Sequence, residues 1–264
     1  HELVLAALRR GLHVLVEKPF ALRVDHAREM VDAATAAGLK LCVVHNLQFG
    51  RAATKARRML ETGALGELRG VFGFQSSNHE RRLPTWYREL PLGLFTGEAP
   101  HLVYLLQSFL PGAEVESLHV GRALGPDDNT PDLVTLSARS GAVVGSLQMT
   151  FVGSLSEWLL VVMGTEATVV LDFFRDVAFT LPNDHGHLAR NVLGTQLRAA
   201  GGHLADTVVA GVDRLRGRLD YGNDEVVARF VRAVSTGERD ERIDGELGLD
   251  VVRVLEAAAD ARQR

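Results

Sequence analysis

The order of predicted elements in the first 46 residues constrains the fold of this chain most strongly. Residues 2–10 and 24–37 carry apolar side chains at helical spacing, and a glycine follows each segment. Two short apolar runs, residues 14–16 and 41–44, are typical of buried strands. Because helices that alternate with buried strands build parallel sheets, we expect this region to belong to an α/β domain.

Two opposite charges stand at the end of the first predicted strand, where Glu17, Lys18 and Pro19 follow residues 14–16 directly. Open parallel sheets bind their ligands at the carboxyl ends of their strands. A residue that precedes proline is restricted to extended or turn conformations. We therefore expect the Lys18 amine to project from a stiff strand end, where it either meets a ligand or forms a structural salt bridge.

Residues 1–49, with this order of elements and the Glu-Lys-Pro motif, resemble the glucose-fructose oxidoreductase / inositol dehydrogenase / rhizopine catabolism (Gfo/Idh/MocA) superfamily of NAD(P)-dependent oxidoreductases. The resemblance implies that Lys18 lies beside the nicotinamide and the substrate, with Glu17 and Pro19 in the same cofactor site. Asn46 matches an asparagine that is common at that point in the superfamily. It is a substrate or nicotinamide contact, or it caps the strand end.

A second segment, residues 93–112 (GLFTGEAPHLVYLLQSFLPG), resembles the superfamily motif Gly-Gly-x-x-x-Asp-x-Gly-x-His, whose Asp and His both face the substrate. His101 matches the histidine, and Gly93 matches one of the opening glycines. Gly97 stands at the position of the aspartate, and Ala99 replaces the later glycine. Three explanations stay open: the neighbouring Glu98 compensates as a substrate ligand, the substrate differs, or the activity has decayed.

Lys18 and His101 are the predicted catalytic residues, because moving a hydride from a carbinol carbon requires a proton acceptor and a charge that holds the oxygen. Pro100 fits a first helical position. We therefore place His101 in the first turn of the helix that continues over residues 102–110. The positive end of a helix disfavours an imidazolium, which predicts a neutral His101. Burial lowers the pKa of a lysine and a neighbouring Glu17 raises it, so the direction for Lys18 stays open.

The remainder of the chain predicts a second domain of α+β type, over residues 51–264. Strand patterns over 68–74, 115–120, 133–138, 143–149, 157–163 and 167–171 suggest hairpins in a mostly antiparallel open sheet, with helices on one face. Helices are expected over 51–62, 201–216, 224–234 and 249–262, with Asn223 capping the third. The resemblance implies that the open sheet forms a contact between subunits of a homo-oligomer.

The length of residues 75–93, with two prolines and no apolar period, predicts either a functional loop or disorder, and two aromatic residues favour the loop. Trp86 and Tyr87 within it are candidates to wall a sugar-sized substrate pocket, although loop aromatics often pack locally. Arg81 and Arg82 could grip a carboxylate or phosphate of the substrate. Solvated loop charge explains these two arginines more simply.

The sequence nowhere contains a Gly-x-Gly-x-x-Gly turn, the pattern that binds a dinucleotide pyrophosphate. In the superfamily this turn lies upstream of the first helix seen here. We therefore expect residues 1–50 to be the carboxyl-terminal part of a Rossmann domain in a chain truncated at its amino end. The choice between NAD and NADP cannot be read from the residues present.

Composition excludes several other classes of protein. A formal net charge of −4 gives no reason to expect nucleic acid as a partner, and no apolar run approaches the roughly 18 residues of a membrane span. Without a signal peptide pattern, we expect a cytoplasmic protein. Three histidines could suggest a metal site: His185, His187 and His203. Their spacing fits no compact zinc pattern, so no metal is expected.

These observations favour an NAD(P)-dependent oxidoreductase that acts on a hydroxyl or keto group of a sugar, polyol or sugar derivative. The alternative is a degenerate homologue that acts as a ligand-binding or oligomeric module without redox chemistry, and Gly97 is the feature that favours it.

Overall fold

The computed structural model describes residues 1–78, 82–83, 85–217 and 221–263. Its first unit alternates helices and strands as predicted: α1 (Glu2–Leu8), β1 (Val14–Val16), α2 (Val24–Ala36) and β2 (Leu41–Val43). β1 and β2 pair in parallel, with Val14 opposite Leu41. The prediction of a parallel α/β arrangement for this region is confirmed.

The core of this first unit is built from the apolar stripes of α1 and α2, which close over the strands. Ala27 and Met30 of α2 are fully buried there, and Leu249 and Val252 of the last helix complete the cluster. On the edge of β2 away from β1, Cys42 forms an isolated antiparallel bridge with Asp244. Burial raises the pKa of the Cys42 thiol to about 12, which makes the thiol inert.

A larger, mixed sheet follows, and in the described part of the chain it has seven strands in the order β11-β10-β9-β3-β8-β7-β4. The strands are β3 (Leu68–Ser76), β4 (Glu114–Val120), β7 (Leu133–Ser140), β8 (Val143–Thr150), β9 (Glu157–Gly164), β10 (Ala167–Asp172) and β11 (Val177–Pro182). The predicted β7–β8 and β9–β10 hairpins are present. β3 runs parallel to β8 and lies between β8 and β9. After β3 the chain passes to β4 at one edge of the sheet and then returns through β7 to β8.

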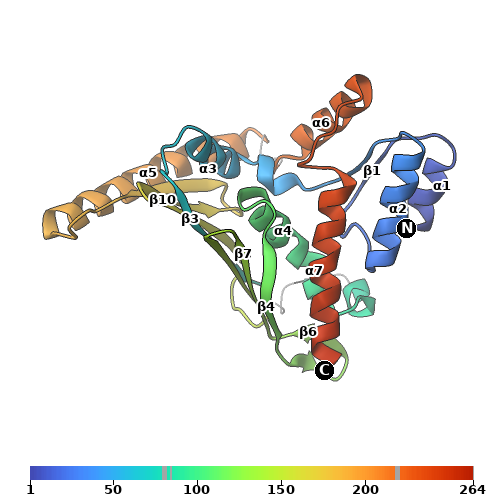
Figure 1. Ribbon diagram of the computed structural model, residues 1–264. Helices are drawn as coiled ribbons and strands as arrows, with labels where there is room; N and C mark the ends of the chain where they lie inside the picture. Colours follow the sequence, from blue (N-terminus) through green and yellow to red (C-terminus); the bar gives the residue numbers. More distant parts are fainter. Residues whose placement is uncertain (79–81, 84, 218–220, 264) are drawn as a thin grey trace.

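Helices α3 (Arg51–Glu61), α4 (Leu94–Phe109) and α7 (Gly245–Gln263) pack against one face of this sheet (Figure 1). Alternation explains this choice of face, since Val134, Leu136 and Ala138 of β7 are buried and the residues between them are not. α7 packs on the large sheet with Val251 and Leu255 and on the first unit with its other side. Two short strands, β5 (Ala123–Gly125) and β6 (Asp128–Pro131), form a separate hairpin.

The turn η1 (Asn46–Phe49) connects the two units, and α6 (Asn223–Thr236) packs against it. The predicted cap of α6 is shifted by one residue: the cap is Gly222, in a left-handed conformation at φ 85°, and Asn223 is the first helical residue. A Cβ atom at position 222 would collide with the Asn46 carbonyl oxygen, so glycine is required at this close approach.

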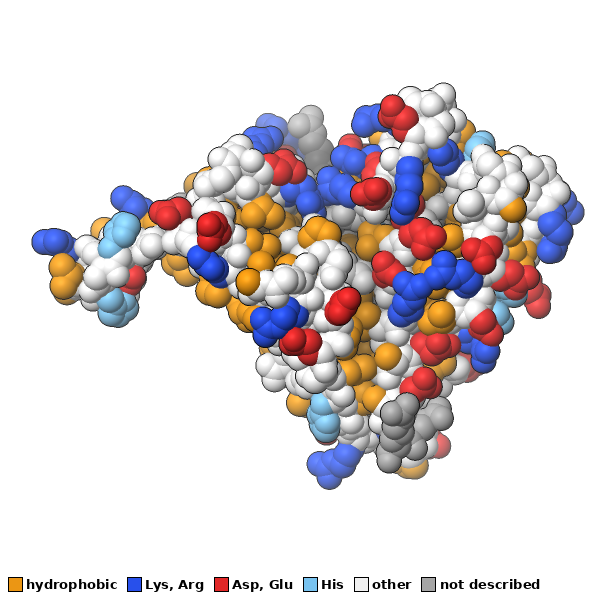
Figure 2. All heavy atoms as spheres, in the orientation of Figure 1, with side chains coloured by type: hydrophobic (Ala, Val, Ile, Leu, Met, Phe, Trp, Pro, Cys, Tyr) orange, Lys and Arg blue, Asp and Glu red, His pale blue; other side chains and the backbone are white. Residues whose placement is uncertain are grey.

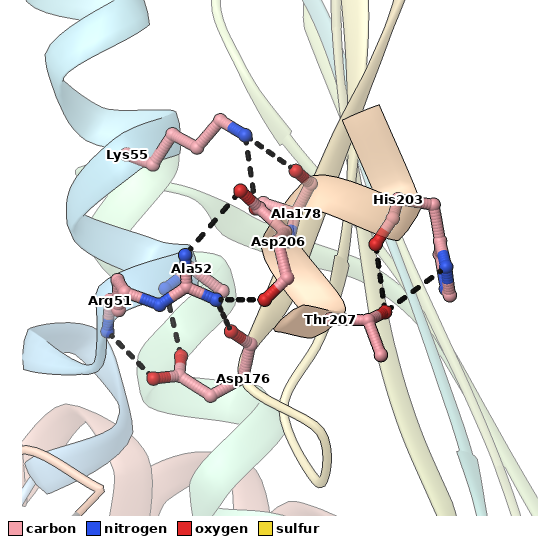
Figure 3. A network of polar contacts seen from close by, with 8 residues as sticks. All are labelled: Arg51, Ala52, Lys55, Asp176, Ala178, His203, Asp206 and Thr207. Atoms are coloured by element: carbon pink, nitrogen blue, oxygen red, sulfur yellow. Dashed lines mark hydrogen bonds and ion pairs between the residues drawn. The ribbon is translucent and has the colours of Figure 1, made fainter. Parts of the chain in front are cut away.

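Helix α5 (Ala189–Leu215) begins 12 residues before the predicted start, because Gly201 and Gly202 lie inside it and do not end it. It packs along β11 and is joined to α3 by ion pairs (Figure 3). Asp206 of α5 accepts a hydrogen bond from Lys55 at 3.0 Å and from the Ala178 backbone N–H at 3.0 Å. These contacts fix the edge of the sheet to α3. None of the described helices is both long enough and apolar enough to cross a bilayer.

Candidate active site

Lys18 connects the end of β1 to the first turn of α4. Its Nζ atom donates a hydrogen bond of 2.8 Å to the backbone carbonyl of Gly97. Burial lowers the pKa of the amine, and the charge of the exposed Glu17 opposes this effect without overcoming it. The direction that the sequence left open is therefore downward, which brings Lys18 closer to proton transfer near neutral pH.

His101 lies in the interior of α4 and not in its first turn, which corrects the sequence-based prediction. α4 begins at Leu94, after Gly93, and continues through Pro100. The prediction failed because an interior proline loses one backbone hydrogen bond and crowds the carbonyl four residues earlier, so it usually marks a helix start. The pKa of His101 is still lowered well below its usual value, first by burial and then by the charges of Lys18 and His45.

A hydrogen-bond network around Tyr104 defines the orientation of His101. The Tyr104 hydroxyl lies 2.9 Å from His101 Nδ1, accepts the Leu47 backbone N–H at 3.0 Å, and donates to Asn46 Oδ1 at 3.3 Å. A phenol carries one proton. With that proton on Asn46, the contact to His101 requires an N–H on Nδ1, and Nε2 is then the proton acceptor.

Two residues that the sequence analysis did not single out also belong to this cluster. His45 stacks on Tyr104 with ring centroids 4.4 Å apart, and burial lowers its pKa to about 3. The Trp158 ring lies 4.7 Å from the His101 ring. The position of His45 beside Asn46 at a strand end was a usable signal, whereas Trp158 becomes a neighbour only through the pairing of β9 with β3.

Glu98 faces the sheet and not Lys18. Its carboxylate accepts hydrogen bonds from Gln75 Nε2 at 2.9 Å and from the Ser77 hydroxyl, both at the end of β3. Gln75 is paired with Trp158 across the sheet, so Glu98 lies on the side of the cluster where Trp158 meets His101. Its proposed role as a substrate ligand stays a prediction.

The space beside Gly97 is open. A Cβ atom built at this position would meet no atom within 4 Å. The Cβ atom of the aspartate in the superfamily motif would therefore displace no neighbour here, next to the carbonyl that Lys18 contacts.

The two aromatic candidates of the loop differ in burial. Tyr87 lies in the short helix η2 (Thr85–Glu89), is buried, and donates a hydrogen bond of 2.9 Å from its hydroxyl to Asp128. Trp86 is 55% exposed. Arg81 lies outside the described residues. The pocket-wall roles of Trp86 and Tyr87 stay predictions.

Three buried polar atoms of the cluster have no hydrogen-bond partner among the described residues: His45 Nδ1, Gln75 Oε1 and Trp158 Nε1. Such atoms are rare in folded proteins and often mark functional sites. All three belong to the cluster around His101 and Tyr104, where they are available to a bound cofactor or substrate. The described residues hold no group of three or more His, Cys, Asp and Glu side chains placed to bind a metal ion.

Known proteins resemble this chain in sequence and in fold. Residues 1–45 match the Gfo/Idh/MocA family, described as an oxidoreductase family with an NAD-binding Rossmann fold. The 1,5-anhydro-D-fructose reductase of Ensifer adhaerens is 29% identical over 174 residues, which are 64% of this chain and 52% of the reductase. The chain thus spans about half the length of that relative.

Solved structures share the fold over nearly the whole chain. A levoglucosan dehydrogenase in complex with NADH aligns with a TM-score of 0.74 and 18% identity, covering 99% of this chain and 74% of the other. An inositol dehydrogenase homologue of Azotobacter vinelandii, bound to NADH and myo-inositol, aligns with a TM-score of 0.68 and 21% identity over 100% of this chain and 73% of the other.

The fold is therefore that of dehydrogenases with a parallel Rossmann sheet followed by a large, mostly antiparallel sheet. The resemblance predicted from the sequence is confirmed: residues 1–45 match the Gfo/Idh/MocA oxidoreductase family, and the chain shares its fold with solved dehydrogenases.

Proposed function

We propose that the protein is an NAD(P)-dependent oxidoreductase that transfers hydride between nicotinamide and a hydroxyl or keto group of a sugar, polyol or sugar derivative. One observation carries this proposal: the Lys18 amine and the His101 imidazole, from segments 83 residues apart, meet on one face of α4, and both have lowered pKa values. Relatives that include the anhydrofructose reductase and a D-xylose dehydrogenase of Paenarthrobacter nicotinovorans support the substrate class.

The chain's own residues divide the work on the reacting hydroxyl group. Lys18 is fixed by the Gly97 carbonyl and donates a hydrogen bond to the substrate oxygen, which polarises it. His101 presents Nε2 to the hydroxyl proton while Tyr104 holds Nδ1. Trp158 and His45 pack around this pair and limit the access of water. The nicotinamide supplies the hydride acceptor when bound.

Further parts of this proposal concern the remaining site residues and the assembly. Glu17 and Pro19 would line the cofactor beside Lys18, and Asn46 would contact the substrate from the far side of Tyr104. Residues 1–50 would belong to the nucleotide-binding domain and 51–264 to the substrate domain. The outer face of the large sheet, where Phe74 is 38% exposed, would form a homo-oligomer contact.

The test is a nicotinamide absorbance assay on the full-length protein, with NAD and NADP each run against a panel of sugars and polyols. Turnover with at least one polyol is the expected result, and the preferred cofactor is read from the same data. Binding of a polyol, seen by calorimetry, without absorbance change across the panel would favour the non-catalytic alternative that Gly97 suggests.

A further inference from the structure

We propose that Arg57, Arg229 and Arg242 form a binding site for a phosphate-sized oxyanion, separate from the candidate active site. The three arginines come from α3, from α6 and from the segment before α7. They meet beside Phe49, at the end of η1. Neither the redox chemistry proposed above nor the relatives' names assign a role to them.

The arginines open onto a cavity of about 540 Å³ between α3 and α6. Figure 2 shows Lys and Arg side chains gathered on the surface between these helices, with a few acidic side chains among them. Four arginines and two glutamates line the cavity, which leaves an excess of positive charge. The lining residues are Phe49, Thr54, Arg57, Arg58, Glu61, Glu225, Arg229 and Arg242.

Arg229 is already neutralised, and the other two arginines are not. Arg229 pairs with Glu225 at 2.8 Å and with Asp240 at 2.9 Å. Among the described residues, Arg57 and Arg242 have no carboxylate within ion-pair distance. Their Nη2 atoms donate instead to backbone carbonyls, Arg57 to Ser108 at 3.0 Å and Arg242 to Gln48 at 3.0 Å.

These two unpaired guanidinium groups are held close together against their mutual repulsion. Burial lowers the pKa of Arg242 to about 10, and the charges of Arg57 and Arg229 add to the effect. Burial also lowers the pKa of Arg57. The Nε atom of Arg57 is buried without a partner among the described residues. A bound anion would offset the repulsion between these guanidinium charges.

Aromatic rings fix the direction of the guanidinium groups. Arg242 and Arg229 lie 4.3 Å and 4.6 Å from the Phe49 ring centroid, and Arg57 lies 5.0 Å from that of Phe109. Planar guanidinium groups held in place match the paired oxygens of phosphate better than a flexible lysine does. The chemistry therefore favours a tetrahedral oxyanion, such as free phosphate or a phosphate monoester.

The proposed anion site is coupled to the turn that carries Asn46. Arg242 donates from Nε to Gln48 Oε1 at 3.2 Å, and Gln48 Nε2 donates to the His45 carbonyl at 3.0 Å. An anion that fixes Arg242 would therefore also fix η1, which lies between the anion site and the Tyr104 network.

The test measures binding of inorganic phosphate and, separately, of glucose 6-phosphate by calorimetry and by thermal unfolding of the full-length protein. Chloride at matched ionic strength is the reference salt. We expect either phosphate probe to raise the Tm above the chloride reference. We expect Arg57→Gln and Arg242→Gln each to weaken the binding of these phosphate probes by about 10-fold or more.

Arg139→Gln is the matched control, because Arg139 is a surface arginine paired with Glu116 on the large sheet. It should leave phosphate binding unchanged. Arg58 lines the same cavity at an exposed position, so Arg58→Gln should fold even if Arg57→Gln does not. It should weaken phosphate binding by a smaller factor than Arg57→Gln does. Equal stabilisation by phosphate and chloride, or undiminished binding in the folded Arg57→Gln and Arg58→Gln variants, would overturn the proposal. Neither readout depends on redox turnover.

Discussion

The Lys18 amine lies 2.8 Å from the backbone carbonyl oxygen of Gly97, which joins the end of a strand in the first unit to the helix that carries His101. Gly97 precedes His101 by one helical turn, so the contact places the amine on the face of α4 that presents the imidazole. The proposed catalytic pair is thus assembled by packing between the two units and not by a local motif.

Replacing Gly97 with aspartate should be tolerated and should raise the pKa of Lys18. The position has open space, and an added carboxylate next to a buried amine favours its charged form. We expect the limb of the pH–rate profile that reflects the ionisation of Lys18 to shift to higher pH by about one unit. Gly194→Asp, at an open helical glycine of α5, is the control and should leave the profile unchanged.

The Tyr104→Phe variant should lose both stability and turnover. It leaves His101 Nδ1 and the Leu47 backbone N–H without their partner, at a cost of about 1–3 kcal/mol in the free energy of unfolding. Because Tyr104 positions the imidazole, we also expect kcat to fall by about 10-fold or more, with KM little changed. A stability loss with an unchanged kcat and pH profile would assign Tyr104 a purely structural role.

The buried His45 should make the fold sensitive to acid. Its pKa of about 3 in the folded chain lies below the ordinary value of 6.5, so the unfolded chain binds its proton first as the pH falls. The stabilisation is complete above pH 6.5 and declines towards pH 3 at about 1.4 kcal/mol per pH unit. In His45→Phe, the free energy of unfolding, measured with urea between pH 6 and pH 4, should change with pH by about 1.4 kcal/mol per pH unit less than in the unmodified protein. An unchanged slope would contradict the assignment.

Much of the fold could be predicted from the sequence because its signals are local. Helical stripes, glycine stops and turn residues identified the parallel first unit and two hairpins of the large sheet. The insertion of β3 between β8 and β9 depends on long-range pairing, which periodicity does not encode. β11 (Val177–Pro182) was missed, since its apolar run is short and lacks a turn signal of the usual kind.

The candidate site was predicted only where a motif marked it. Lys18, His101 and Asn46 stand in recognisable segments. Tyr104 joins His101 to Asn46, and Lys18 reaches the same helix at Gly97. Trp158 reaches His101 only by way of the sheet register, so no local pattern could find it. Pro100 misplaced the start of α4 because tertiary packing here overrides the usual behaviour of proline in a helix.

The most direct test of the account is the turnover of the Lys18→Ala variant in the full-length protein, measured beside its affinity for the nicotinamide cofactor. Lys40→Ala is the matched control, because Lys40 also donates to a backbone carbonyl but lies on the surface. We predict that Lys18→Ala lowers kcat by about 100-fold or more, with cofactor binding largely retained and Lys40→Ala fully active. Full turnover in Lys18→Ala would contradict the assignment of this site.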